Sequence, residues 1–162
     1  MLGDVVEAAS TVGAVRVVTA DLEAKAVACA LGATVVDDPG GGQGGAVAVG
    51  IAGLVGGCLV VNADLPCATP EALARLAAQS PALVPAFDGT TNALSLPDPT
   101  WFAPLYGPGS AARFAGAGLA AVSIPELEQD VDTFSDILRL PLPVGRRTAL
   151  VLHQHKIDPG CV

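Results

Sequence analysis

Short runs of β-branched and apolar residues alternate with longer Ala- and Leu-rich stretches, and this alternation constrains the fold more than any other feature of the sequence. Runs of this length and composition predict buried strands, and the stretches between them predict helices. The predicted strands are 15–19, 34–36, 59–62, 82–87, 92–96 and 119–124. Strands that alternate with helices pair into a largely parallel sheet covered on both faces. The sequence therefore predicts an α/β fold, a doubly wound and mostly parallel sheet in a single domain.

Local signals predict where several helices begin and end. Asp21 is a predicted N-cap for a helix over 21–31, and Gly32 is placed to end that helix. Thr69 and Pro70 predict the start of another helix, because Pro needs no N–H partner at the first helical position. The remaining predicted helices are 5–10, 46–54, 110–115 and 133–140. Residues 1–140 form the predicted domain, and 141–162 form a predicted surface tail.

The charge balance excludes some classes of partner. Sixteen acidic residues and eight basic ones give a net charge of −8. Duplex nucleic acid and anionic membranes need clustered Lys and Arg, so neither is expected as a partner. A small anionic ligand stays compatible, because one divalent cation can invert the local field. No secretory signal is recognised, and the composition predicts a cytoplasmic protein with Cys29 and Cys58 in its core.

Acidic residues follow one predicted strand and precede one predicted helix. Asp64 comes just after strand 59–62, and ligands of open α/β sheets bind at the carboxyl ends of strands. Asp130 and Asp132 alternate in an extended stretch, so only one of them is expected to face that edge. Carboxylates meeting there would suit Mg²⁺. The alternatives are that Asp64 belongs to a turn and that Asp132 or Thr133 caps the next helix.

Four segments in series point to a known family. They are Asn62-Ala63-Asp64-Leu65-Pro66, Asp88-Gly89-Thr90-Thr91-Asn92-Ala93-Leu94, Tyr106-Gly107-Pro108-Gly109-Ser110 and Asp130-Val131-Asp132-Thr133. Together they resemble the 2-phospho-L-lactate/phosphoenolpyruvate guanylyltransferases of coenzyme F420 biosynthesis, within the molybdenum-cofactor-type nucleotidyltransferases. The resemblance covers roughly 15–140. It implies a Rossmann-like fold of the nucleotide-diphospho-sugar transferase type, and residues 1–140 would be the nucleotidyltransferase domain.

The resemblance also implies an activity and a set of site residues. GMP would move from GTP onto phosphoenolpyruvate or 2-phospho-L-lactate, with Mg²⁺ as cofactor and pyrophosphate as the second product. Asp64 and Asp132 would bind the metal. The phosphorylated three-carbon acid would contact Thr91, Asn92, Gly107, Ser110 and Arg113, and the nucleotide would contact Gly44 and Gly45. An Asp-Gly turn between two strands explains residues 88–90 equally well and is compatible with a pocket.

Two departures from the family pattern leave alternatives open. The family's amino-terminal strand and Lys/Arg-containing triphosphate loop have no counterpart in the sequence, so the domain is predicted to be incomplete at its start. Gly44 and Gly45 stand where relatives often carry Asn at a helix start, which puts guanine selectivity in question. The alternative functions are an inactive acid-binding module or partner subunit, and a related transferase with another nucleotide or acceptor. A homodimer stays open.

Overall fold

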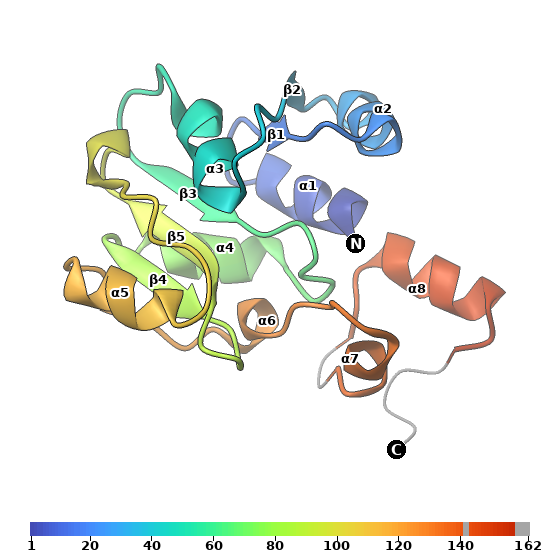
Figure 1. Ribbon diagram of the computed structural model, residues 1–162. Helices are drawn as coiled ribbons and strands as arrows, with labels where there is room; N and C mark the ends of the chain where they lie inside the picture. Colours follow the sequence, from blue (N-terminus) through green and yellow to red (C-terminus); the bar gives the residue numbers. More distant parts are fainter. Residues whose placement is uncertain (141–142, 158–162) are drawn as a thin grey trace.

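The strands lie in two sheets in the computed structural model, which describes residues 1–140 and 143–157 (Figure 1). In the smaller sheet, β1 (Arg16–Val18) pairs in parallel with β2 (Thr34–Val36). The larger sheet has the order β3-β5-β4-β6 and comprises Cys58–Val61, Thr91–Leu96, Ala82–Pro85 and Ala120–Ala121 in that order. Strand β5 is antiparallel to β3 and β4, while β4 and β6 are parallel. The α/β fold is confirmed, and the sheet is mixed rather than mostly parallel.

Strand β5 is antiparallel to β4 because a tight turn connects the two strands. Gly89 has φ +85°, and the Asp88 carboxylate accepts hydrogen bonds from the backbone N–H and the hydroxyl of Thr90. A turn this short can connect only antiparallel neighbours, since a parallel connection needs a crossover of a dozen residues or more. The predicted Asp-Gly turn is confirmed.

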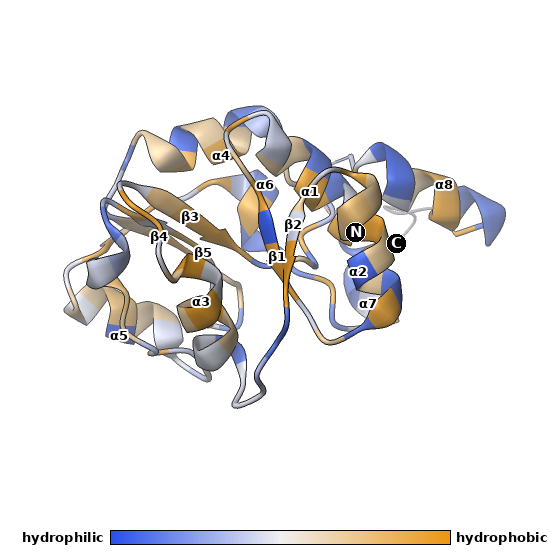
Figure 2. Cartoon of the chain, turned by 90° about the horizontal axis from the view of Figure 1, so that it is seen from above, coloured by the Kyte–Doolittle hydropathy of each residue, from blue (hydrophilic) through white to orange (hydrophobic). Residues whose placement is uncertain are grey.

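Helices cover both faces of the larger sheet (Figure 2). Alternate side chains along each strand point to opposite faces, so each face contributes to a separate core. On one face, Leu59 and Val84 pack with α4 (Pro70–Ala77) and α6 (Pro125–Glu128). On the other face, Leu83 and Leu94 pack with Phe114 of α5 (Ser110–Gly116). The predicted doubly wound arrangement is therefore present in this sheet.

A third, smaller core holds the two-stranded sheet. Val6 of α1 (Leu2–Ser10) and Ala28 of α2 (Leu22–Ala30) are buried against Val17 and Val35. A groove of about 980 Å³ separates the two sheets and is lined by residues of both β1 and β3. Gln43 and Asn62 also line this groove.

The predicted helix caps are present. The Asp21 carboxylate accepts a hydrogen bond from the N–H of Ala24, and Gly32 follows the helix with φ +77°. The Thr69 hydroxyl accepts one from the N–H of Ala72, which lies in the first turn of α4. These bonds satisfy N–H groups that a helix start leaves without partners.

The segment predicted as a surface tail, from residue 141 onward, contains a helix in its described part. Residues Arg146–Gln154 form α8, and Phe134–Leu138 form α7. The carboxylate of Asp4, in α1, accepts hydrogen bonds from the N–H groups of Arg147 and Thr148 at the start of α8. This cap comes from the other end of the chain, so no local sequence signal predicted it.

Several boundaries and one burial prediction also differ. Helix α3 spans Gln43–Ile51 and so begins earlier than predicted, while the short helix α6 was not predicted. The strand expected over 119–124 is paired only at β6. Cys29 is exposed, because α2 turns only Ala28 fully inward, and Cys58 at the start of β3 is half-buried. Among the described residues, no helix combines the length and apolarity that crossing a bilayer requires.

Candidate functional site

Three carboxylates meet at the carboxyl end of β3. Asp64, Asp130 and Asp132 each offer one oxygen, and these oxygens lie within 4.8 Å of one another. Asp64 and Asp130 are half-buried and Asp132 is exposed, so the cluster opens to solvent on one side. The geometry suits a divalent cation with hard oxygen ligands.

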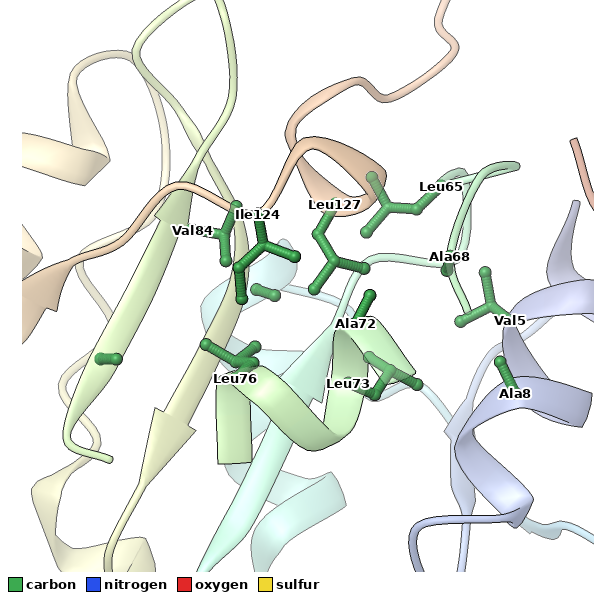
Figure 3. Packing of buried hydrophobic residues seen from close by; sticks show 12 residues of the cluster. Val5, Ala8, Leu65, Ala68, Ala72, Leu73, Leu76, Val84, Ile124 and Leu127 are labelled. Carbon is green, nitrogen blue, oxygen red and sulfur yellow. The ribbon is translucent and has the colours of Figure 1, made fainter. Parts of the chain in front are cut away.

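Apolar anchors hold the two segments that carry these acids. Leu65 directly follows Asp64, Leu127 lies three residues before Asp130, and both leucines are fully buried in one cluster (Figure 3). The N–H of Val131 donates to the Asp64 carbonyl at 3.1 Å, which joins the segments directly. The backbone that carries the acids is therefore held by buried side chains and by a hydrogen bond between the two segments.

The expectation that only one of Asp130 and Asp132 faces the site is wrong. Both contribute an oxygen to the cluster. The alternation argument requires a regular strand, whereas residues 129–133 are neither strand nor helix. The predicted cap is also present, because the Thr133 N–H and hydroxyl both donate to the Asp136 carboxylate in α7.

The electrostatics of the cluster disfavour three ionised carboxylates. Burial raises the pKa of Asp64, and the negative charges of Asp130 and Asp132 raise it further. Burial likewise raises the pKa of Asp130, with Asp132 and Asp88 contributing repulsion. Like charges at this distance destabilise each other unless a cation lies among them.

One atom of the cluster fits a metal ligand most directly. The Oδ1 atom of Asp64 is buried and has no hydrogen-bond partner among the described residues. Buried carboxylate oxygens are normally paired, since leaving one unpaired is costly. The chemistry of the donor set and this unpaired oxygen both fit a hard divalent cation such as Mg²⁺.

Three of the residues predicted to bind the acid lie together where β5 and α5 begin. The hydroxyls of Thr91 and Ser110 are 3.0 Å apart and both residues are buried. The Ser110 N–H donates to the Gly107 carbonyl at 2.9 Å, and the Ala111 N–H donates to the Gly89 carbonyl. The N–H groups of Ser110 and Ala111 at the start of α5 are therefore engaged within the protein.

Arg113 holds the loop that carries Gly107. Its guanidinium donates to four backbone carbonyls, those of Leu105, Tyr106, Gly107 and Pro108. The side chain is exposed, yet most of its N–H groups are directed at this loop rather than toward Asp64. Arg113 therefore holds the loop in place, and few of its N–H groups are left to bind a substrate carboxylate.

Asn92 differs most from its predicted role. Its side chain is 1% exposed, and its amide nitrogen donates to the Leu127 carbonyl at 3.1 Å. The amide of Asn62 donates to the Asn92 side-chain oxygen at 3.4 Å, and the amide of Gln43 donates to the Asn62 oxygen at 2.6 Å. The amide of Asn92 therefore points into the protein.

Gly44 and Gly45 lie in the first turn of α3, close to this amide chain. A Cβ on Gly44 would come within 2.8 Å of Pro104, and a Cβ on Gly45 would come within 2.9 Å of the Gly40 carbonyl oxygen. Only Gly fits such close approaches. The helix start has no acidic residue in its first turn and no side-chain cap, which leaves it electropositive.

Sequence reasoning missed Gln43 and Asn62 and underrated Asp130. Asn62 carried a usable signal, because it is a polar residue immediately after a buried strand, as Asp64 nearly is. Gln43 is the one polar side chain within the glycine run 40–45. Its proximity to Asn62 depends on how α3 packs, which no local pattern reveals.

The chain is similar to proteins of a known family. Residues 1–131 match the family described as the MobA-like NTP transferase domain. The chain is 42% identical to a phosphoenolpyruvate guanylyltransferase of Geodermatophilus obscurus, over 94% of the chain and 76% of that protein. It is 38% identical to one from Streptomyces coelicolor (89% and 75% covered) and 32% identical to one from Roseiflexus castenholzii (92% and 76% covered).

Proposed function

Since the chain belongs to the MobA-like NTP transferase family and is a relative of the phosphoenolpyruvate guanylyltransferases, we propose that it transfers GMP from GTP to phosphoenolpyruvate and releases pyrophosphate. The single structural observation that carries the proposal is the cluster of Asp64, Asp130 and Asp132. The acceptor could also be 2-phospho-L-lactate, and coenzyme F420 biosynthesis is the pathway that the family resemblance implies.

The reaction needs little covalent chemistry from the protein. A phosphate oxygen of the acceptor forms a bond to the α-phosphorus of GTP, and the bond from that phosphorus to the α–β bridging oxygen breaks. Pyrophosphate leaves with the electron pair of the broken bond. The acceptor phosphate is already ionised near neutral pH, so no side chain must remove a proton from it. The protein contributes positioning and charge neutralisation.

Asp64, Asp130 and Asp132 would hold the metal ion. Mg²⁺ bound there would bring the phosphate oxygens together and neutralise the charge on the departing pyrophosphate. The unpaired Oδ1 atom of Asp64 supports its role as a ligand. Asp130 is included because its oxygen lies within 4.8 Å of those of Asp64 and Asp132.

The two substrates would approach this centre from different elements. Backbone groups at Gly44 and Gly45 are proposed to contact the nucleotide, because the absence of side chains allows close approach at the electropositive start of α3. Thr91, Gly107 and Ser110 are proposed to shape the pocket for the three-carbon acid. A protein that consumes GTP is expected to work in the cytoplasm, where nucleoside triphosphates are made.

The experiment is an acceptor and nucleotide screen. Purified protein is incubated with GTP, MgCl₂ and either phosphoenolpyruvate or 2-phospho-L-lactate, pyrophosphate release is followed, and the guanylylated product is identified by mass spectrometry. ATP and CTP replace GTP in parallel reactions, since Gly44 and Gly45 depart from the family's base-binding pattern.

The expected result is pyrophosphate release that requires GTP, the acid and the metal together, and its loss in Asp64→Asn. Glu23→Gln is the matched control, because it also removes one negative charge but lies on the exposed side of α2. No release under conditions where a relative such as the Streptomyces coelicolor enzyme is active would contradict the proposal.

A further inference from the structure

The side chain of Asn92 is buried between the two segments that carry the carboxylates. It lies in β5, which pairs with β3, and it is 1% exposed. A buried amide that bridges two segments restricts their relative movement when its hydrogen bonds are satisfied. The contacts of Asn92 therefore bear on how the metal ligands are held.

Asn92 is bonded to both segments. Its amide nitrogen donates to the carbonyl of Leu127, three residues before Asp130. Its backbone carbonyl accepts from the N–H of Asn62 at 2.9 Å, and its side-chain oxygen accepts from the Asn62 amide at 3.4 Å. Asn62 lies two residues before Asp64 in the sequence. One residue thus connects the chain leading to Asp64 with the chain leading to Asp130.

Asn92 also acts on one of the carboxylates directly. Its side chain forms a hydrogen bond with the carboxylate of Asp130. The same amide group therefore contacts a metal ligand and holds the turn that precedes it. A neutral, apolar side chain of similar size would do neither.

The exposed side chain of Gln43 fixes the orientation of the Asn62 and Asn92 amides. Because its amide donates to the Asn62 oxygen at 2.6 Å, the Asn62 nitrogen is turned toward Asn92. The oxygen of Asn92 then faces Asn62, and its nitrogen faces Leu127 and Asp130. The exposed end of the chain of amides lies at the first residue of α3, beside the glycines proposed to contact the nucleotide.

We propose that Asn92 is a positioning residue of the metal centre, which sets the separation of the Asp64 and Asp130 segments and orients Asp130, and that Gln43 and Asn62 fix its amide. The inference rests on the metal centre of the proposed function. It replaces the substrate contact that the family resemblance implied for Asn92. Hydrogen-bonded partners of metal ligands commonly change metal affinity by about 10–100-fold when mutated.

The test measures metal binding without nucleotide or acid. Mn²⁺ is titrated into the protein, and free Mn²⁺ is measured by electron paramagnetic resonance for the wild type, Asn92→Leu and Ser95→Ala. Ser95 is the matched control, because it is a buried polar residue of the same strand and pairs with Leu59 and Ala82 rather than with the carboxylate segments. Circular dichroism checks that each variant is folded.

The expected result is that Asn92→Leu weakens Mn²⁺ binding about 10–100-fold while Ser95→Ala leaves it unchanged. Wild-type affinity in a folded Asn92→Leu protein would overturn the proposal, as would an equal loss in Ser95→Ala. Should Asn92→Leu not fold, Gln43→Leu takes its place, since Gln43 is exposed. A smaller loss, below about tenfold, is expected there, and no loss would overturn the proposal.

Failure of the inference and failure of the proposed function give different results. Mn²⁺ binding that weakens in Asn92→Leu, in a wild-type protein that releases no pyrophosphate, supports the positioning role and contradicts guanylyl transfer. Wild-type protein that transfers GMP while Asn92→Leu keeps full Mn²⁺ affinity contradicts only the positioning role. Wild-type protein that binds no Mn²⁺ overturns the positioning role and the metal centre together.

Discussion

Replacing Asp64 by Asn is expected to make the metal-free protein more stable. The substitution keeps the shape of the side chain and removes one of three clustered negative charges. It also introduces an amide that can donate to Asp130 or Asp132, where the buried Oδ1 atom of the carboxylate has no partner. Both effects act in the same direction.

The magnitude follows from the spacing of the carboxylates. Two unit charges 4.8 Å apart repel by about 3.5 kcal/mol at an effective dielectric constant of 20. Asp132 is exposed and the cluster opens to solvent, so screening reduces the net gain to about 1–2 kcal/mol. For a chain of this length, that gain corresponds to an increase in Tm of roughly 2–8 °C.

The assay is thermal unfolding of the wild type and Asp64→Asn in EDTA and in saturating Mn²⁺. A ligand at 100 times its Kd stabilises the folded state by about 2.7 kcal/mol, which exceeds the gain from the substitution. The variant should therefore have the higher Tm in EDTA, and the wild type should have the higher Tm with Mn²⁺. Glu23→Gln, which changes the net charge equally, should follow the wild type in both.

The pH dependence supplies a second check on the same variant. The pKa of Asp64 is raised in the folded protein, so the folded state binds a proton more readily than the unfolded state does. Metal-free wild type should therefore lose stability as the pH rises from the ordinary Asp value of about 3.9 through the raised pKa. The difference from Asp64→Asn should disappear below that window. A variant that is less stable than wild type in EDTA at neutral pH would refute this reasoning.

Four further perturbations test other parts of the structure. As the pH falls, Mn²⁺ binding should weaken at a higher pH than it would with carboxylates of ordinary pKa. The reason is that the pKa values of Asp64 and Asp130 are raised and the metal ligands must be ionised. Titration of Mn²⁺ at several pH values measures this. Asp4→Ala should lower the free energy of unfolding by about 2 kcal/mol in urea, because the start of α8 loses its cap, whereas an unchanged midpoint would show that α8 is not held this way. Arg113→Ala should raise KM for phosphoenolpyruvate more than KM for GTP, because the loop at Gly107 loses its hydrogen bonds; equal changes in both would contradict a local effect. Gly45→Ala should weaken GTP binding measured by calorimetry, because its Cβ would lie 2.9 Å from the Gly40 oxygen and displace the start of α3.

Periodicity and caps were sufficient to predict most elements of the fold. Asp21 and Thr69 cap helices as expected, because their bonds are made within three residues. The pairing of strands was harder to predict, since β1 and β3 lie in different sheets although their sequences look alike. Sheet membership depends on packing between distant segments, and a propensity pattern carries no information about it.

The candidate site, like the fold, could be predicted only in part from the sequence. The position of Asp64 after a strand indicated the correct edge of the sheet, and the resemblance supplied the acidic partner. Asp130 was set aside because a two-residue period was assumed where the backbone is irregular. The buried amide of Asn92 could not be foreseen, since its partners Asn62 and Leu127 lie thirty or more residues away in the sequence.

A two-stranded sheet is only marginally stable by itself, so β1 and β2 are expected to open at a lower free energy than the larger sheet. Helix α3 contacts β1, and Gly50 of that helix packs against Val18. The backbone amides of β1 and β2 should therefore exchange with solvent deuterium faster than those of β4 and β5. Slower exchange in β1 when GTP is added would indicate that the nucleotide orders this half of the protein against the more rigid half that carries the carboxylates.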